Sequence, residues 1–238
     1  MIIKSTKGAG VDRVKILIHG PSGIGKTTLA KTLTEKTLVV SAESGLMSIR
    51  DSDIDYVDIT TDDDGNLIPK ELRVQKLGDI YKYLLTKEAS DKYSVVFIDS
   101  LTEIGQNISE SLFEKNTDKK DTFKVWGEYT SQMRNLIKAF RDLPKYHVIM
   151  TALTKEYTDE LKNKKLGIDI QGSIGEQCPA LFDEVFHYAQ LVNQAGDLER
   201  VLLTSLTDRI FAKDRSGSLD KYEKPNLQTI INKIKGVN

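Results

Sequence analysis

Cysteine is almost absent from this sequence: the 238 residues include one, Cys178. A single cysteine has no partner for an internal disulfide, which favours a reducing compartment. Long hydrophobic runs are also missing. The first residues, MIIKSTKGAG, lack the apolar core of a signal peptide, and no run approaches the ~18 apolar residues of a membrane span. We therefore expect a soluble protein that stays in the cytoplasm.

An excess of charge of one sign is lacking too. Lys and Arg number 34 against 35 Asp and Glu, a formal net charge of -1. Bulk charge therefore does not indicate a polyanion-binding protein, and any nucleic-acid contact requires a local basic loop. The length suits one α/β domain with a well-buried core, and no repeat or low-complexity linker divides it. We expect a single domain over residues 1–238, with its core at about 13–235.

The most informative stretch is HGPSGIGKTT, residues 19–28. It fits G-x-x-x-x-G-K-[ST] from Gly20 to Thr27, follows an apolar run that ends near Ile18, and precedes a helical pattern. This context predicts a loop whose backbone N–H groups surround phosphates, with Lys26 reaching the β- and γ-phosphates and the Thr27 hydroxyl holding Mg²⁺. A helix starting near Gly25 would add its positive dipole end. The predicted nucleotide contacts are Gly20, Pro21, Ser22, Gly23, Ile24, Gly25, Lys26, Thr27 and Thr28.

Hydrophobic patterning predicts an α/β fold. Apolar strand patterns alternate with helical ones, and hairpin-like strands follow from 183 to 215 before a short closing helix at 225–234. This order predicts a mostly parallel central sheet flanked by helices, with antiparallel edge strands at the C-terminal side. Residues 111–122 are expected to form a loop, and 162–167 a hairpin turn within a long connection. The expected parallel strands are 14–19, 37–41, 56–60, 93–99 and 146–151.

Acidic residues follow two of these strands. Asp99 ends the strand 93–99, where its carboxylate suits a Mg²⁺ ligand of a phosphate loop. Its alternative role is to cap the next helix. Many P-loop ATPases carry a second acid directly after this Asp, but here that position is Ser100. Glu43, just past the strand 37–41, is the favoured catalytic base and Glu103 its rival. Glu43 also has the plain interpretation of an exposed acid or cap.

Lys213 and Arg215 are two residues apart on an expected edge strand, so both side chains point to one face. Such a pair can clasp a triphosphate, in its own subunit or in a neighbouring one. The plain alternative is a solvated edge strand protected by its charges.

Together these motifs resemble the RecA-type core of P-loop ATPases. The matching segments are GPSGIGKT, VVSAESGL, VVFIDSLTEI and HVIMTA, and FAKDRSG is similar to the Lys-x-Arg finger of hexameric helicases. Over residues 13–235 the chain resembles phage nucleotide-binding proteins, some of them single-strand annealing or recombination proteins. The resemblance implies ATP and Mg²⁺ as cofactors, Glu43 as the base, a phosphate-sensor strand ending at Thr151, and Lys213 and Arg215 acting in trans. It also implies a head-to-tail homo-oligomer, ring or filament, working in the host cytoplasm.

The same resemblance implies contact with single-stranded DNA, and a single-strand-binding protein as a further partner. Two lysine-containing loops are the candidates: 114–122, with Lys115, and 153–175. Their lysines also have the ordinary interpretation of a solvated face, and aromatic residues are sparse beside them. The sensor strand ends in Thr151 and Ala152 where recombinases usually carry a Gln, which departs from the family pattern. The predicted DNA contacts are Lys119, Lys120, Lys155, Lys162, Lys164 and Lys165.

The function predicted from the sequence is therefore a Mg²⁺-dependent ATPase with a RecA-like core that binds single-stranded DNA in phage recombination or annealing. Two alternatives stay open. One is a nucleotide-gated oligomeric binding module with little turnover, and the other is a P-loop kinase of small molecules. Three histidines, His19, His147 and His187, fall on expected strands and are predicted to be core residues, since no metal-ligand spacing is present.

Overall fold

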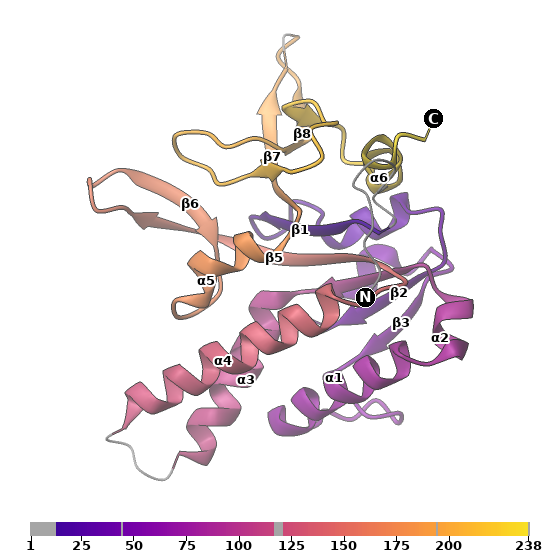
Figure 1. Cartoon of the computed structure of the whole chain (residues 1–238), viewed down its shortest axis with the longest axis vertical. Coiled ribbons are helices and arrows are strands. Elements are labelled where there is room, and N and C mark those ends of the chain that lie inside the picture. Colours follow the sequence, from indigo (N-terminus) through magenta and orange to yellow (C-terminus); the bar gives the residue numbers. More distant parts are fainter. Residues whose placement is uncertain (1–12, 44, 117–120, 194, 238) are drawn as a thin grey trace, which may run out of the picture.

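A mixed β-sheet runs through the molecule and carries helices on both faces (Figure 1). The structure is a computed structural model, and it describes residues 13–43, 45–116, 121–193 and 195–237. Within these ranges ten strands form the sheet. The strands are β1 (Lys15–Gly20), β2 (Thr37–Ser41), β3 (Asp55–Asp58), β4 (Val95–Asp99), β5 (His147–Thr158), β6 (Lys164–Ile168), β7 (Glu184–Val192), β8 (Leu198–Leu203), β9 (Lys213–Asp214) and β10 (Tyr222–Glu223).

Six strands in the order β7-β1-β5-β4-β2-β3 are parallel. Antiparallel strands extend the sheet beyond β7, where β8, β9 and β10 add to the edge, and β6 forms a hairpin with β5. The predicted fold class, a mostly parallel sheet with antiparallel strands at the C-terminal side, is confirmed. The order also places β5 between β1 and β4, so the carboxyl ends of these three parallel strands lie next to one another.

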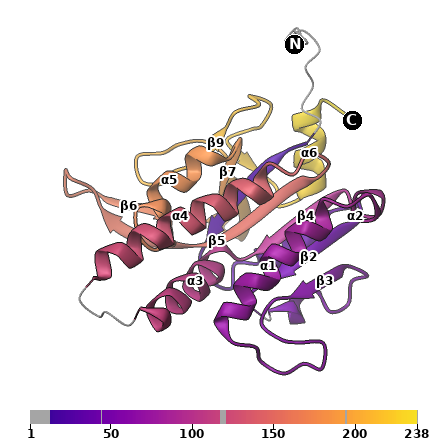
Figure 2. The ribbon, with the colours of Figure 1, turned by 60° about the horizontal axis from the view of Figure 1, so that its bottom comes forward.

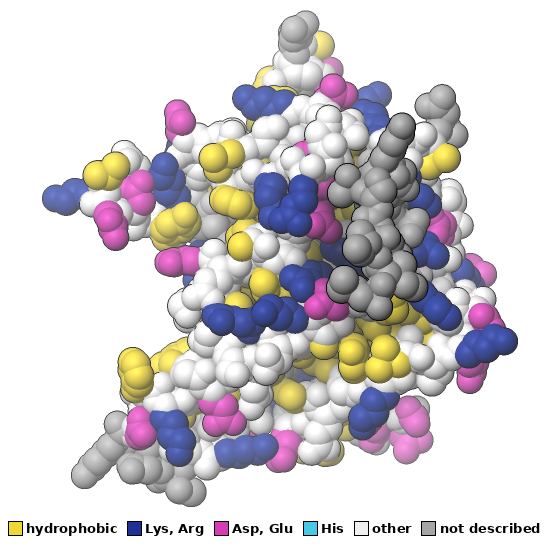
Figure 3. All heavy atoms as spheres, viewed as in Figure 1, with side chains coloured by type: hydrophobic (Ala, Val, Ile, Leu, Met, Phe, Trp, Pro, Cys, Tyr) yellow, Lys and Arg dark blue, Asp and Glu magenta, His cyan; other side chains and the backbone are white. Residues whose placement is uncertain are grey.

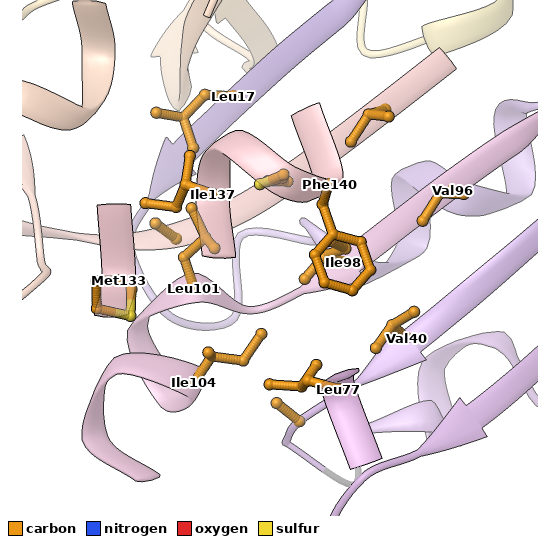
Figure 4. Packing of buried hydrophobic residues seen from close by; sticks show 14 of the residues in the cluster. Leu17, Val40, Leu77, Val96, Ile98, Leu101, Ile104, Met133, Ile137 and Phe140 are labelled. Carbon is orange, nitrogen blue, oxygen red and sulfur yellow. The ribbon is translucent and has the colours of Figure 1, made fainter. Parts of the chain in front are cut away.

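Three long helices cover one face of the sheet: α1 (Lys70–Leu84), α3 (Leu101–Lys115) and α4 (Thr122–Arg141). Figure 2 shows them side by side. Strand residues alternate between the faces, so Leu17 of β1 and Ile98 of β4 point toward these helices. There they meet Leu77 of α1, Ile104 of α3 and Met133 of α4 (Figure 4).

The other face carries α6 (Leu227–Lys235) and the short 3-10 helices η1 (Thr27–Thr32) and η2 (Leu46–Ile49). Ile16 and Ile18, the neighbours of Leu17 in β1, pack there with Ile230 and Ile231 of α6. The remaining helices are α2 (Lys87–Lys92), α5 (Ile174–Gln177) and the 3-10 helix η3 (Cys178–Leu181). Among the described residues no helix is long and apolar enough to cross a bilayer.

Several predicted element boundaries were wrong. Residues 111–115 belong to α3 instead of a loop, because Ser111 and Leu112 continue its packing face. β5 runs on to Thr158, seven residues past the predicted end, because β6 pairs with its outer half. The segment RIFAKDR contributes only the two-residue strand β9. Helix packing set the end of α3, and strand pairing set the ends of β5 and β9. Neither can be read from the local sequence pattern.

Candidate active site

The loop between β1 and η1 has glycines where the fold leaves no room or demands an unusual backbone. A Cβ added to Gly20 would lie 2.7 Å from the carbonyl oxygen of Tyr188, because β7 runs beside β1 at this point. Gly25 has φ +106°, a left-handed conformation that other residues rarely adopt. The loop therefore turns tightly at both ends, as a loop must whose backbone N–H groups face inward.

Lys26 lies inside this loop and is 8% exposed. Its Nζ donates hydrogen bonds to the carbonyl oxygens of Gly20 (3.0 Å) and Pro21 (2.9 Å), so the ammonium bridges the two sides of the loop. Burial lowers the pKa of Lys26, and the negative charges of Glu43 and Asp99 oppose this effect. The ammonium is thus within electrostatic range of both predicted carboxylates.

The helix after the loop is shorter than predicted. η1 is a 3-10 helix that begins at Thr27, and Leu33 directly after it is already extended. The hydroxyls of Thr28 and Thr32 donate hydrogen bonds to the backbone carbonyl oxygens of Gly25 and Leu29, in each case three residues earlier in the chain. The helix-dipole contribution predicted for this loop is therefore small, and the phosphate-binding geometry depends on the loop's own N–H groups and Lys26.

Asp99 ends β4 and is 4% exposed, and each of its carboxylate oxygens accepts a hydrogen bond from a threonine hydroxyl. Thr27 donates to Oδ2 at 2.5 Å, and Thr151 donates to Oδ1. Because β5 lies between β1 and β4, Thr151 stands behind Asp99 and orients it. Thr151 was predicted as a nucleotide contact; it is fully buried, and its hydroxyl also lies 3.4 Å from the carbonyl oxygen of Ile98.

Glu43 lies just past β2, which is the neighbour of β4. The hydroxyl of Ser100, the residue after Asp99, donates a hydrogen bond to Glu43 Oε1. Ser100 occupies the position where many P-loop ATPases carry the second acid, and here it orients Glu43 by this hydrogen bond. The half-buried carboxyl of Glu103 lines an open hollow with Glu43 and Arg73, and burial next to the Glu43 charge raises the pKa of Glu103. General bases work best when their pKa lies near the operating pH, so this shift leaves Glu103 as the rival of Glu43.

Lys213 and Arg215 lie at the opposite end of the sheet from the loop. β9 pairs with the start of β7, where Glu184 stands opposite Ile16 of β1. Lys213 Nζ donates to the carbonyl oxygens of Pro179 (3.0 Å) and Phe182 (2.6 Å), and burial lowers its pKa. Arg215 forms an exposed ion pair with Asp183 at 2.5 Å.

The predicted DNA contacts on the second loop lie on a projecting β-hairpin, β5–β6 (Figure 1). Lys164 pairs with Glu156 and Lys165 with Asp159, while Lys155 donates to the carbonyl of Ile170. Lys162 is in the exposed turn. On the face shown in Figure 3, basic and acidic side chains are intermixed.

The first predicted DNA loop lies mostly outside the described residues, and this includes Lys119 and Lys120. Lys115, at the end of α3, forms an ion pair with Glu71 of α1 at 2.9 Å.

The histidines are buried, as predicted. His19 Nδ1 lies 2.9 Å from the Thr154 hydroxyl and 3.3 Å from His187 Nδ1, and its Nε2 lies 2.9 Å from the carbonyl oxygen of Phe211. Burial lowers the pKa of His19 to about 3 and that of His187 to about 4, so both rings are neutral at physiological pH. Among the described residues, no group of three or more His, Cys, Asp or Glu side chains is arranged to hold a metal ion by itself.

Two residues near the loop were missed from the sequence: Tyr188 and Arg200, on the β7–β8 hairpin. A Cβ added to Gly25 would lie 3.3 Å from Arg200 Nη1 and 3.7 Å from the Tyr188 hydroxyl. The hairpin itself was predicted, but its place beside β1 was not. The available signal was the run of strand residues through 184–192, long enough to pass the end of β1.

A sequence model described as an AAA domain matches residues 12–216, most of the chain. The chain belongs to this AAA-domain family. As an AAA domain it is a P-loop protein of the ATPase type, in agreement with the loop at 20–28 and the acid at Asp99. The annealing or recombination family inferred from resemblance is a finer assignment, which this match does not make. A search among curated proteins finds no match.

Among solved structures, the AAA domain is similar to one described as a prototypical ATPase from the type III secretion system of pathogenic bacteria. The two share 15% sequence identity with a TM-score of 0.44, and the similarity covers 74% of this chain and 52% of the other. The chain thus spans about half the length of that protein.

Proposed function

We propose that this AAA domain is a Mg²⁺-dependent ATPase. One observation carries the proposal: the fold brings Lys26, Thr27, Asp99 and Glu43, from three separate segments, to one end of the sheet. The donor set fits magnesium and a triphosphate. Asp99 and Thr27 offer a carboxylate and a hydroxyl oxygen, the ligand types that Mg²⁺ takes, and the loop has the glycines that a close approach of phosphates needs.

Each residue has a defined task in this reaction. Lys26 and the loop N–H groups bind the phosphates, and Lys26 stabilises the charge that develops on the γ-phosphoryl oxygens. Thr27 and Asp99 would hold Mg²⁺, which supplies charge neutralisation. Glu43, held by Ser100, orients a water and accepts its proton. The water oxygen bonds to the γ-phosphorus while the bond to the bridging oxygen breaks, which yields ADP and phosphate.

A second copy of the chain completes the site in this proposal. Arg215 lies beside the amino end of β1 and β7, about five strand residues or ~17 Å from the loop. Within one subunit it is therefore too far from the phosphates to act on them. A head-to-tail neighbour would bring Arg215 and Lys213 to the next loop, the arrangement of an arginine finger in trans. Single-stranded DNA, on the β5–β6 hairpin, is the partner we propose for the assembly.

The test compares purified wild-type protein with Glu43→Gln and Lys26→Ala, measuring ATP affinity and phosphate release with Mg²⁺. We expect Glu43→Gln to keep ATP affinity and to lose turnover by ~10²–10⁴-fold, the usual share of a general base. Lys26→Ala should lose affinity as well. Glu103→Gln is the matched control and should retain most turnover.

Two results would contradict the proposal. If wild-type protein bound ATP but released no phosphate, the nucleotide-gated binding module would be the better description. If phosphate appeared only on an added small-molecule acceptor, the chain would be a kinase.

A further inference from the structure

The β7–β8 hairpin lies against the phosphate loop on the side away from Asp99. β7 pairs with β1 as far as His19 and His187, and its next residue, Tyr188, lies beside Gly20. In the sheet order β8-β7-β1-β5-β4, the loop leaves β1 with the hairpin on one side and Asp99 on the other. The hairpin therefore forms a wall of the loop that the reaction proposed above does not use.

Arg200 of β8 is the charged residue of this wall. It stands opposite Gln190 in the ladder, and Tyr188 stands opposite Leu202, so Arg200 and Tyr188 are diagonal neighbours on one face of the hairpin. The position of an added Cβ on Gly25 is 3.3 Å from Arg200 Nη1 and 3.0 Å from the Thr28 hydroxyl. The guanidinium is thus in contact range of the loop backbone where the loop turns into η1.

The charge of Arg200 is also available. Arg215 pairs with Asp183, Arg141 with Asp142 and Arg209 with Glu156. Arg200, in contrast, has no ion pair with a carboxylate in the part of the chain that the structure describes; its neighbour is the Tyr188 hydroxyl. Tyr188 is 3% exposed and packs in the hydrophobic core, while Arg200 is exposed. An exposed guanidinium beside a phosphate loop, without an acid to neutralise it, suits an anion.

We infer that Arg200 binds the nucleotide on the α-phosphate side of the loop, with Tyr188 positioning its guanidinium. This rests on the proposed nucleotide site. The loop backbone surrounds the α- and β-phosphates, while the lysine reaches the β- and γ-phosphates and the next hydroxyl faces Mg²⁺. Thr27 marks the Mg²⁺ side by its bond to Asp99. Thr28, near Arg200, marks the other side, so Arg200 contacts phosphates that ADP and ATP share.

The experiment measures equilibrium affinities of ADP and ATP, each with Mg²⁺, for wild type, Arg200→Ala and Arg200→Gln. A charge-assisted hydrogen bond to phosphate is worth roughly a 10- to 100-fold change in affinity. We expect both variants to weaken ADP and ATP by the same factor within that range. Arg209→Ala is the control, an exposed arginine on another loop, and should leave both affinities unchanged. Tyr188→Phe, which keeps the ring, should give a smaller loss.

The outcomes separate this inference from the proposed function. If wild-type protein bound neither nucleotide, the nucleotide site itself would be wrong. If wild type bound both and Arg200→Ala bound ADP equally well, Arg200 would not be a ligand of the shared phosphates, whatever happened to ATP. Thermal unfolding without nucleotide checks that the variants fold; because Arg200 is exposed, we expect melting temperatures close to wild type.

Discussion

At the scale of single residues, Gly25 meets two demands at once. Its φ of +106° costs other residues about 1–2 kcal/mol, and a Cβ there would press on the Thr28 hydroxyl at 3.0 Å and Arg200 at 3.3 Å. Backbone strain and crowding can be separated, because Gly65 has a similar φ of +82° in an exposed turn with open space around it.

We therefore predict that Gly25→Ala and Gly65→Ala destabilise the fold by similar amounts, about 1 kcal/mol each, and that only Gly25→Ala weakens ATP binding, by ~10-fold or more as a lost charged hydrogen bond would. Urea unfolding and ATP titration of both variants measure this. Equal ATP affinities for the two variants would show that the loop does not need the glycine for binding.

Site residues that belong to a short contiguous motif, or that stand at the end of one recognisable strand, could be predicted from the sequence, whereas residues placed by the order of the strands could not. Residues 20–28 form a contiguous motif, Glu43 follows a recognisable strand and Asp99 ends one, so the sequence alone could propose all of them. The bond from Ser100 to Glu43 joins two strand ends and depends on β2 lying next to β4. Arg200 depends on β7 lying next to β1. Strand order is a global property, and the pattern of one strand does not contain it.

At the scale of elements, the β5–β6 hairpin allows a test of DNA binding. The Lys164–Glu156 ion pair is exposed and the Lys165–Asp159 pair is partly exposed. Surface ion pairs are individually weak, so the lysines can exchange their acids for phosphates. We predict that Lys162→Ala with Lys164→Ala lowers affinity for a single-stranded oligonucleotide and reduces the slope of log affinity against log salt by about 1.4, or about 0.7 for each lysine. Fluorescence anisotropy over a salt series measures both. Lys82→Ala with Lys87→Ala is the matched control on another face, and an equal slope in the two double variants would remove the hairpin from the interface.

The turn after β9 depends on a buried carboxyl. Glu184 is 1% exposed and accepts a hydrogen bond from the Ser216 N–H, and the adjacent Asp214 accepts others from Gly217 and Leu219. Burial, with the Asp214 charge beside it, raises the pKa of Glu184 from 4.5 to about 8. The folded protein therefore keeps this proton where the unfolded chain has lost it. The contribution of Glu184 to stability is complete below pH 4.5 and is lost as the pH rises to about 8.

We predict that Glu184→Gln, which cannot lose a proton, removes this part of the pH dependence. The free energy of unfolding of wild type should fall relative to the variant between pH 5 and pH 8, the range bounded by the ordinary and the raised pKa of the carboxyl. Urea melts at several pH values measure it, with the exposed Glu199→Gln as control. Parallel curves for wild type and Glu184→Gln would contradict the shifted pKa.

Element boundaries show the same limit as the site residues. Amphipathic spacing indicated α4 almost to its ends, because its buried residues recur every three or four positions. The short length of η1 was not predicted, since the threonine hydroxyls that bond back to the loop look like ordinary helix residues in a one-dimensional pattern. β9 consists of only two residues because its pairing with β7 ends there.

At the scale of the whole molecule, the sheet separates the phosphate loop from Arg215. The two groups lie at opposite ends of the parallel strands β1 and β7, so a contact between copies that joins them is heterologous and builds a ring or a filament. Such an assembly makes each active site the joint property of two subunits.

We predict that two inactive variants restore activity when mixed. Lys26→Ala lacks the loop cation and Arg215→Ala lacks the finger, which alone costs ~10³-fold or more in turnover. In random co-assembly, about a quarter of the interfaces join an intact loop to an intact Arg215, so turnover should recover to roughly a quarter of wild type. Phosphate release from equimolar, co-refolded mixtures measures this. Recovery no higher than the sum of the separate variants would place Arg215 outside the neighbouring site.

The buried thiol of Cys178 can report on local opening of the structure. Cys178 is 0% exposed at the start of η3, and burial raises its pKa to about 12, which leaves almost no thiolate to react. Lys213 donates hydrogen bonds to the carbonyl oxygens of Pro179, in this helix, and of Phe182, directly after it. An alkylating reagent should therefore modify the protein only during excursions that expose η3. The rate of labelling, followed with and without nucleotide, would report how firmly η3 is held in place beside Lys213, one of the two residues proposed to act in trans.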